Sequence, residues 1–457
     1  MQRRRSSMSK QTDIRICEVE IGFEDHPYRT PLKFGGVVTT HCVLMNITIQ
    51  VENGEGKQSG GFGSMPLGNA WSFPSQRVSF NESMAAMRRL GNRMAEMTRQ
   101  LRDSGHPIDL MVDLEHRFLD LAVEVEKELD LADPIPKLCT LVTASPIDAA
   151  LHDAFGKVNG INSYDGLGSD CMAHDLAHYL NDDFRGEYLG RYTSRQPKPR
   201  MPLYHLVGAL DPLTAADIDQ RIDDGLPETL PEWISADGLT HLKIKLNGDD
   251  LAWDVDRVCS VDRVASGAQA ARGVENWAYS LDFNEKCQNV DYLLDFLARI
   301  QEKSPGAFER VAYIEQPTAR DLKANPENKM HRAAHIRPVV IDESLDDFES
   351  LLLARELGYS GVALKACKGQ SGSLLMGAAA QKYGMFLCVQ DLTCPGASFL
   401  HSAGLAARVP TVTAIEGNAR QYCPEANTGW AERFPSIFQV QDGTLGTGCL
   451  TGDGLGH

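Results

Sequence analysis

The stretch HLKIKLNGDD, residues 241–250, places two lysines on either side of one isoleucine in a short β-like run. Side chains two residues apart in a strand point to the same face, so Lys243 and Lys245 would lie side by side. Two ammonium groups in that position repel each other unless water or anions offset the repulsion. The run is therefore either a solvated strand edge or a strand that carries two inward-facing bases.

HLKIK is one of eight short apolar runs that recur from about residue 200, each followed by a segment of helix length. The spacing is what a strand, a helix and two loops require. Eight such units are typical of a (β/α)8 barrel, although a doubly wound sheet can hold as many strands. The runs cover residues 202–207, 241–245, 279–283, 311–316, 338–342, 361–365, 385–390 and 411–416.

The first 160 residues have a different, α+β pattern. Residues 14–63 alternate in polarity and are rich in β-branched residues, which predicts a strand, a turn and a second strand. Helical periodicity follows at 83–101, about 110–130 and 145–158. The glycine-rich stretch 60–68 is predicted to be a mobile loop near the active-site mouth, where Trp71 and Phe73 either close over a substrate or pack the first domain.

The composition excludes several classes of partner. The 457 residues carry a net charge of -17, which disfavours nucleic acid and acidic membrane surfaces. No apolar run approaches the ~18 residues of a membrane span. The eleven cysteines include no C-x-x-C pair, which indicates reduced thiols in a cytoplasmic protein.

Charged side chains stand at the carboxyl ends of the runs, where a barrel places its catalytic groups. The third, fourth and fifth runs carry Asp282, Glu315 and Asp342. A single strand-end aspartate is commonly a helix N-cap, but three successive carboxylates on one rim suit Mg²⁺. Further candidates at this rim are Asn284, Glu343, Lys368 and Glu416.

Lysines flank the predicted carboxylate arc on both sides. The second and sixth strands of an eight-stranded barrel lie opposite one another, and the sixth run ends in Lys365. A substrate carboxylate bound to the metal would then hold its α-carbon between two bases. A neighbouring cation, a divalent metal and burial each lower the pKa of a lysine from ~10.4, so that one lysine could accept a proton.

Five motifs together resemble the enolase superfamily, and within it the muconate-lactonising-enzyme-like group (the mandelate racemase/muconate lactonising enzyme family). They are KIK (243–245), LDFNE (281–285), IEQP (314–317), IDES (341–344) and LKACKGQSG (364–372). SPIDAALHDAFGK (145–157) resembles the helix that ends the capping domain of that family. HPYRTPLKFGG (26–36) and GGFGSMPLGNAW (60–71) resemble its two specificity loops.

The resemblance implies a (β/α)7β TIM-type barrel with an N-terminal α+β capping domain. It implies Mg²⁺ on Asp282, Glu315 and Asp342, Lys245 and Lys365 as opposed acid/base residues, and Lys243 as a residue that tunes Lys245 or stabilises an enolate. It also implies a homo-oligomer. The expected parts are a disordered tail at 1–13, a capping domain at 14–165, an inserted linker segment at 166–199, a barrel at 200–420 and a C-terminal segment at 421–457 that returns to the cap.

The expected activity is removal of the α-proton of a small-molecule carboxylate through an enolate intermediate. Bases on both faces favour racemisation or epimerisation. An acid-sugar dehydratase or a cycloisomerase would use the same site with one base and one acid.

Two hypotheses come from other classes of protein. HDLAH (174–178) places His174 and His178 four residues apart and is similar to the H-E-x-x-H pattern of zinc peptidases, with Asp175 in place of the glutamate. No third ligand is apparent downstream, so a surface or packing pair on an inserted helix is the simpler interpretation. The other hypothesis is a catalytically silent barrel.

Overall fold

The computed structural model describes residues 10–34 and 37–457. Most of the predicted tail, residues 1–9, lies outside the described residues. At the start of the described chain, the backbone nitrogen of Lys10 donates a hydrogen bond to the carboxylate of Asp13 at 2.8 Å.

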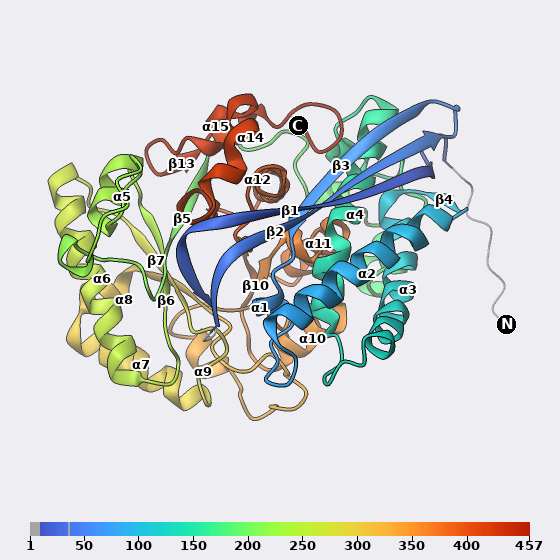
Figure 1. The fold of residues 1–457 in the computed structure, drawn as a ribbon. Helices are drawn as coiled ribbons and strands as arrows, with labels where there is room; N and C mark the ends of the chain where they lie inside the picture. The colour runs from blue at the N-terminus through green and yellow to red at the C-terminus, as the bar shows by residue number, and fades with distance from the viewer. Residues whose placement is uncertain (1–9, 35–36) are drawn as a thin grey trace.

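The N-terminal part is built on an antiparallel sheet of strand order β3-β2-β1-β4. Its strands are β1 (Ile14–Phe34), β2 (Val37–Asn53), β3 (Gln58–Pro66) and the short β4 (Ser104–Gly105). Figure 1 shows the long β1–β2 hairpin, in blue, extending from the N-terminal helices on the right toward the barrel strands on the left. There Arg29 of β1 forms an ion pair with Asp224, which lies in the loop after the first barrel strand.

The N-terminal helices are α1 (Asn69–Ser72), α2 (Phe80–Gln100), α3 (Pro107–Glu128) and α4 (Lys137–Asn159). Helix α4 is buried along almost its whole length and packs against β3. The prediction of a mobile loop at 60–68 is wrong, because residues 60–66 belong to β3 and Gly61 and Gly63 lie against the α4 backbone. Their missing side chains allow this close approach, and only the residues after 66 reach the barrel mouth.

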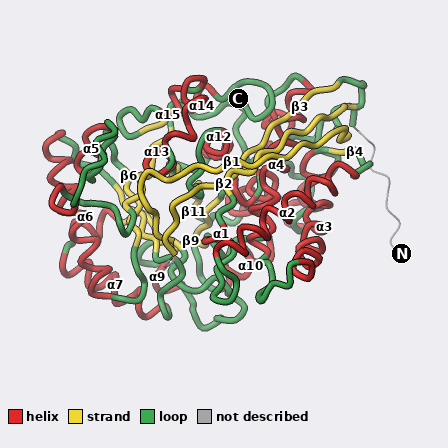
Figure 2. The backbone as a smooth tube through the Cα atoms, in the orientation of Figure 1, coloured by secondary structure: helices red, strands yellow, loops and turns green. Residues whose placement is uncertain are grey.

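All eight predicted runs are strands, and they close into the predicted barrel. The parallel order runs from β5 to β12, and β12 pairs with β5. The strands are β5 (Met201–Val207), β6 (His241–Lys245), β7 (Ala278–Asp282), β8 (Val311–Glu315), β9 (Val339–Ile341), β10 (Gly361–Leu364), β11 (Phe386–Val389) and β12 (Ile415–Glu416). Figure 2 shows the strands of both sheets in yellow and the helices in red.

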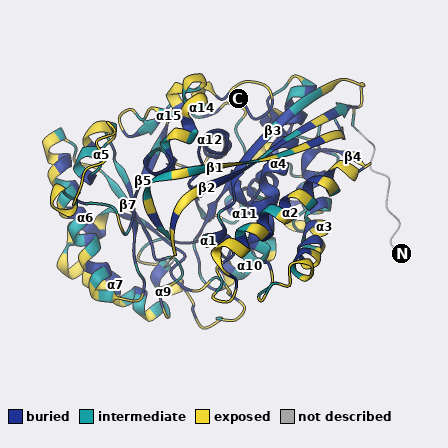
Figure 3. Cartoon of the chain, in the orientation of Figure 1, coloured by how far each residue is buried: buried dark blue, intermediate teal, exposed yellow. Residues whose placement is uncertain are grey.

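Helices surround the barrel and leave its carboxyl end to face the N-terminal part. They are α5 (Leu230–Asp237), α6 (Leu251–Arg272), α7 (Val290–Lys303), α8 (Pro305–Arg310), α9 (His331–Ala334), α10 (Phe348–Glu356), α11 (Gln370–Lys382) and α12 (Ala397–Arg408). The outer faces of α6 and α7 are exposed, whereas the strands inside are buried (Figure 3).

The barrel interior is apolar below its mouth. One cluster of inward-facing side chains fills this level: Tyr204, Tyr313, Val340, Ala363, Cys388 and Ala414. Because side chains of one strand face share a period of two, the inward residues one step closer to the mouth include Glu315, Asp342, Lys365 and Glu416. A layer of packed apolar side chains thus lies directly below the charged side chains of the mouth.

Two connecting segments tie the parts together. Residues 160–200 contain the short 3-10 turns Ser163–Gly166, Leu176–His178, Asp182–Phe184 and Leu189–Arg191. After the barrel come α13 (Ala419–Tyr422), α14 (Thr428–Arg433), α15 (Pro435–Phe438) and β13 (Thr444–Leu445), which pairs with β5. At the end of the chain the Leu455 nitrogen donates to Asp153 of α4.

All eleven cysteines fall within the described ranges, and each is a free thiol. Among the described helices none combines the length and the apolar character that a membrane crossing needs.

Candidate active site at the barrel mouth

The six principal predicted residues meet at the carboxyl end of the barrel. Lys245 pairs in register with Asp282, and Asp282 with Glu315, so three adjacent strands present their charged ends at one level. Asp342 follows the last residue of β9, and Lys365 follows the last residue of β10. All are at most 5% exposed, so their charges interact with little screening by water.

Lys243 lies at the centre of this cluster. Its Nζ is 2.8 Å from Glu315, 2.8 Å from Glu416 and 3.2 Å from Asp282. The solvated-edge interpretation of HLKIK is therefore wrong, because both lysines face inward and are neutralised by carboxylates. Lys245 donates a short hydrogen bond to Asp282.

The opposite side of the mouth is arranged in the same way. Lys365 Nζ lies 2.7 Å from Asp342 Oδ2. Lys368 lies 3.2 Å from the other carboxylate oxygen and also donates to the backbone carbonyls of Asp342 and Leu345. Both lysines thus pair with the Asp342 carboxylate, and Lys368 also fixes the end of β9 through the two carbonyls.

The pKa values show how crowded the charges are. Burial acts to lower the pKa of Lys243, but Glu315, Glu416 and Asp282 outweigh it and leave this pKa well above its usual value. Burial also acts to lower the pKa of Lys365, but Asp342, Glu315 and Glu416 together outweigh it and raise this pKa. At Lys243 and Lys365 the neighbouring carboxylates, and not the neighbouring cation, thus set the direction of the pKa shift.

The pKa values of the carboxyl groups shift in opposite directions. Burial acts to raise the pKa of Asp342, but Lys365 and Lys368 outweigh it and lower this pKa to about 2. Burial and the charge of Asp282 raise the pKa of Glu315 well above its usual value. Burial and the charge of Asp342 raise the pKa of Glu343 to about 8. At both Glu315 and Glu343 burial is the largest cause, and a neighbouring carboxylate adds to it.

This donor set fits a magnesium ion. Asp282, Glu315 and Asp342 offer only oxygen ligands from three neighbouring strands, which is the ligand chemistry of Mg²⁺. An added divalent cation would offset the charge of Asp282, which together with burial raises the pKa of Glu315.

The secondary candidates have distinct surroundings. The backbone nitrogen of Asn284 donates to Asp282 Oδ1 at 2.8 Å, and Asn284 adopts a left-handed backbone with φ of 48°. Glu416 holds Lys243, as described above. Glu343 accepts a hydrogen bond from the Trp71 indole nitrogen at 2.9 Å.

Three residues make contacts at the site that were not predicted from the sequence. Trp71 of α1 lies over Lys365, with Nζ 4.5 Å from the ring centroid, so a residue from the N-terminal part completes the mouth. Arg320 binds Glu285 and donates to the Trp71 carbonyl at 3.1 Å. Gln390 at the end of β11 donates to Glu315. The position of Gln390 at a strand end was the available indication; nothing in the sequence pairs Trp71 with Lys365.

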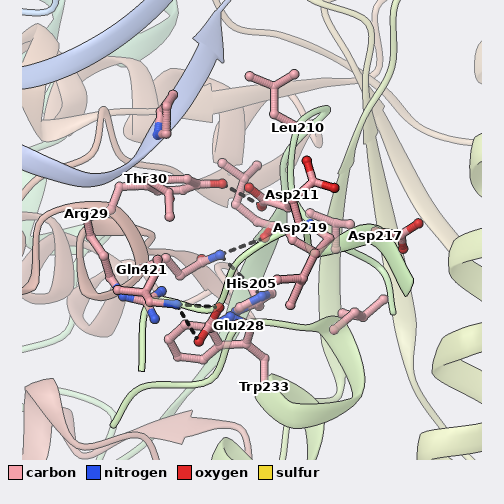
Figure 4. Close-up of a pocket in the computed structure, with 18 of the residues that line it drawn as sticks. Arg29, Thr30, His205, Leu210, Asp211, Asp217, Asp219, Glu228, Trp233 and Gln421 are labelled. Atoms are coloured by element: carbon pink, nitrogen blue, oxygen red, sulfur yellow. Dashed lines mark hydrogen bonds between the residues drawn. The ribbon is translucent and has the colours of Figure 1, made fainter. Parts of the chain in front are cut away.

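A cavity of about 500 Å³ opens beside this cluster at the carboxyl end of β5. Its wall includes Leu206, which pairs in register with Lys243, but none of the six principal charged residues lines the cavity. Figure 4 shows Asp211 and Asp219 on one side of it and His205, Gln421 and Trp233 on another. Arg29 to Pro31 of the N-terminal hairpin close it from above.

The HDLAH segment does not form the predicted helix. Only Leu176–His178 makes a single 3-10 turn, yet the two histidine rings are stacked with centroids 4.0 Å apart. Asp175 accepts a hydrogen bond from the Gly186 nitrogen and so shapes the loop. A third possible metal ligand, Asp109, comes from upstream in α3 rather than from downstream.

Comparison with known families gives one match over the barrel. The family model described as Enolase C-terminal domain-like matches residues 226–457. Among curated proteins nothing matches this chain.

Solved structures match over nearly the whole chain. A muconate lactonizing enzyme from Pseudomonas fluorescens complexed with muconolactone has a TM-score of 0.61 at 17% identity, covering 97% of this chain and 96% of that one. A dipeptide epimerase from Enterococcus faecalis V583, complexed with Mg and L-Leu-L-Tyr, has a TM-score of 0.62 at 15% identity, covering 97% of this chain and 99% of that one. An N-succinyl Arg/Lys racemase from Bacillus cereus ATCC 14579 has a TM-score of 0.61 at 16% identity, covering 97% of this chain and 95% of that one. At these identities the likeness shows the fold.

Proposed function

The chain belongs to the Enolase C-terminal domain-like family and is an enzyme of the enolase superfamily, and we propose that it racemises or epimerises a small-molecule carboxylate by removing its α-proton. The observation that carries the proposal is the placement of Lys245 and Lys365. Strands β6 and β10 lie four steps apart in a closed ring of eight, so the two lysines approach the mouth from opposite sides. Each is paired with one of the outer members of the carboxylate trio.

Asp282, Glu315 and Asp342 are the proposed magnesium ligands. Bound there, Mg²⁺ would supply Lewis-acid stabilisation of the negative charge that develops on the substrate carboxylate. Lys243 cannot readily act as a base, because three carboxylates hold it protonated. Its proposed task is to fix Glu315 and Glu416 and to keep a positive charge beside the reacting group.

The proton transfers are assigned to the flanking lysines. Lys245 takes the α-proton from one enantiomer, and Lys365 returns a proton to the opposite face; in the other direction the two exchange roles. Trp71 covers Lys365 and would exclude water from that face.

The cavity beside β5 supports a substrate larger than its reacting carboxylate. Leu206 of its wall lies on the strand next to Lys243, in register with it, and the walls combine apolar residues with several carboxylates. The part of the substrate distant from the α-carbon would lie there.

The same site could support two other outcomes. A cycloisomerase or an acid-sugar dehydratase needs one base and an acid for the leaving group, and two lysines on opposite sides can supply both. The solved relatives include a muconate lactonizing enzyme as well as an epimerase and a racemase, so the fold is compatible with each.

Proton exchange in D₂O tests the proposal. The protein with Mg²⁺ is incubated with N-acyl amino acids, dipeptides, proline derivatives and acid sugars, and loss of the α-proton signal is followed by NMR. We expect exchange without net conversion of a racemic substrate. Lys245→Ala and Lys365→Ala should each abolish exchange from one enantiomer, whereas Lys303→Ala, a change at an exposed lysine, should not.

Other products would assign a different reaction to the protein. A new keto-acid signal would identify a dehydratase, and a ring-closed isomer a cycloisomerase. Hydrolysis of the dipeptides would favour a peptidase. If both lysine variants kept full exchange, the two-base mechanism would be wrong.

Two further expectations, on cellular location and on oligomeric state, belong to the same proposal. The free thiols support a cytoplasmic location, and resemblance to the family implies a homo-oligomer. Light scattering on the purified protein tests the oligomeric state.

A further inference from the structure

A cluster of three metal-ligating side chains lies outside the barrel mouth. Asp109 is in the first turn of α3, and His174 and His178 belong to the segment between α4 and β5. One potential ligand atom from each residue lies within 4.8 Å of the others. The two imidazole rings are nearly parallel, with an interplanar angle of 12° and centroids 4.0 Å apart. Two segments distant in sequence thus bring two nitrogen donors and one oxygen donor together.

The surroundings leave these donors available. Within the described ranges neither the His174 ring nor the His178 ring takes part in a hydrogen bond. Asp109 accepts a hydrogen bond from the Tyr179 hydroxyl at 2.5 Å through Oδ1, and its other oxygen is not used in this contact. A partner of this kind orients a metal-binding carboxylate. All three residues are half-buried or exposed, so an ion can enter from solvent.

We propose that Asp109, His174 and His178 bind one zinc ion, which joins the segment around His174–Tyr179 to helix α3. Two imidazole nitrogens and one carboxylate oxygen are common zinc ligands, and water would take the fourth position. Tetrahedral ligands about 2.0–2.2 Å from the ion lie roughly 3.3 Å apart, so the side chains need to close by only about 1.5 Å. The oxygen-only set at the barrel mouth suits Mg²⁺ instead, and the two sites are chemically distinct.

The role inferred for this zinc is structural rather than catalytic. Asp175, the candidate general base of the HDLAH motif, is engaged with the Gly186 nitrogen. Tyr179 and Leu180, next to the cluster, line a cavity of about 160 Å³ that also reaches Lys365 and Lys368. An ion at the cluster would hold this wall of the cavity against α3.

Cobalt titration tests the site on the whole chain. The protein is freed of metal with EDTA and titrated with Co²⁺ in excess Mg²⁺, which occupies the oxygen-only set. We expect one equivalent of Co²⁺ with the visible absorption of a four-coordinate, nitrogen-ligated ion, displaced by Zn²⁺. His174→Gln and His178→Gln should lose it and Asp109→Asn should weaken it, whereas His335→Gln, at an exposed histidine on α9's end, should not.

A second measurement does not depend on the spectrum. Zn²⁺ should raise the unfolding temperature of the wild-type protein and of His335→Gln by about 2 °C or more, and should not raise that of His178→Gln. Absence of a one-equivalent site, or an unchanged site in both histidine variants, would overturn the proposal. Neither outcome bears on the proton-exchange assay at the barrel mouth.

Discussion

Trp71 and Glu343 join the N-terminal part of the chain to the barrel through one hydrogen bond, in which the indole nitrogen donates to Oε1 at 2.9 Å. The same ring lies over Lys365. Both residues are buried, so the bond is formed away from water, where an unpaired partner is costly. The residue that closes the mouth is thereby linked to a carboxyl group beside the proposed metal ligand Asp342.

Replacing Trp71 by Phe should lower the exchange rate without unfolding the protein. The ring can still cover Lys365, but Glu343 loses its donor, and leaving a buried acceptor unpaired costs about 1–3 kcal/mol, or roughly 5- to 150-fold. The measurement is kcat/KM for α-proton exchange. Trp277→Phe is the matched control, because that indole donates at 2.7 Å to Tyr279 at the other end of the barrel and lies under Arg310. Equal losses in both variants would contradict the role given to Trp71.

Neutralising each proposed ligand should weaken magnesium binding. Asp282→Asn, Glu315→Gln and Asp342→Asn keep shape but remove a charge, and each should cost at least the roughly 10- to 100-fold in affinity that loss of an outer-shell partner costs. Isothermal titration with Mg²⁺ measures this. Asp256→Asn, at an exposed carboxylate, serves as the control and should bind like wild type. Unchanged Mg²⁺ affinity in all three ligand variants would show that these carboxylates are not the metal ligands.

Asp148 should make stability fall as pH rises. It joins α4 to α11 by accepting bonds from the Ser371 nitrogen and hydroxyl, both at 2.7 Å. Burial raises its pKa to about 7. Between about pH 4 and pH 7 the folded protein then binds more protons at this site than the unfolded chain, so ionisation opposes folding by at most about 4 kcal/mol.

Asp148→Asn should remove this dependence, since the uncharged amide can accept from the Ser371 nitrogen through its oxygen and donate to the Ser371 hydroxyl through its NH2 group. Urea unfolding from pH 5 to pH 8 should show the variant gaining stability over wild type as pH rises. Asp113→Asn, on the exposed face of α3, should follow the wild-type curve. A constant difference between Asp148→Asn and wild type across this range would show that Asp148 does not titrate as stated.

Gly63→Ala should destabilise the N-terminal part. An added Cβ would lie 1.9 Å from the Pro146 carbonyl oxygen and 2.7 Å from the Ala150 nitrogen, so β3 must move away from α4. Overpacking of this kind costs about 1–3 kcal/mol or more. Gly22→Ala, on β1 with nothing within 4 Å of the new carbon, is the control. The free energies of unfolding in urea compare them; similar values would mean that the β3–α4 contact adapts.

The strands of the barrel and the order of its charged ends could be read from the sequence. Each barrel strand is a short buried run, and burial on both faces makes such runs apolar whatever their partners are. The carboxylates and lysines stand at the ends of these runs, and closure of a parallel barrel brings all strand ends to one rim. For this reason Lys245, Asp282, Glu315, Asp342 and Lys365 were predicted together.

Contacts between segments distant in the chain were decided only by the tertiary structure. Lys243 binds Glu315 and Glu416, which are 72 and 173 residues away, and no local pattern selects these partners. The glycine-rich stretch 60–68 has the composition of a loop, but α4 packs so closely on β3 that only glycine fits at positions 61 and 63. Trp71 over Lys365, and Asp109 beside the two histidines, likewise depend on how separate segments pack. The sequence determined the barrel and its chemical groups because these follow from local periodicity; the pairing of charges, the closure of the mouth and the histidine cluster required the packed chain, because they arise from contacts that no local pattern encodes.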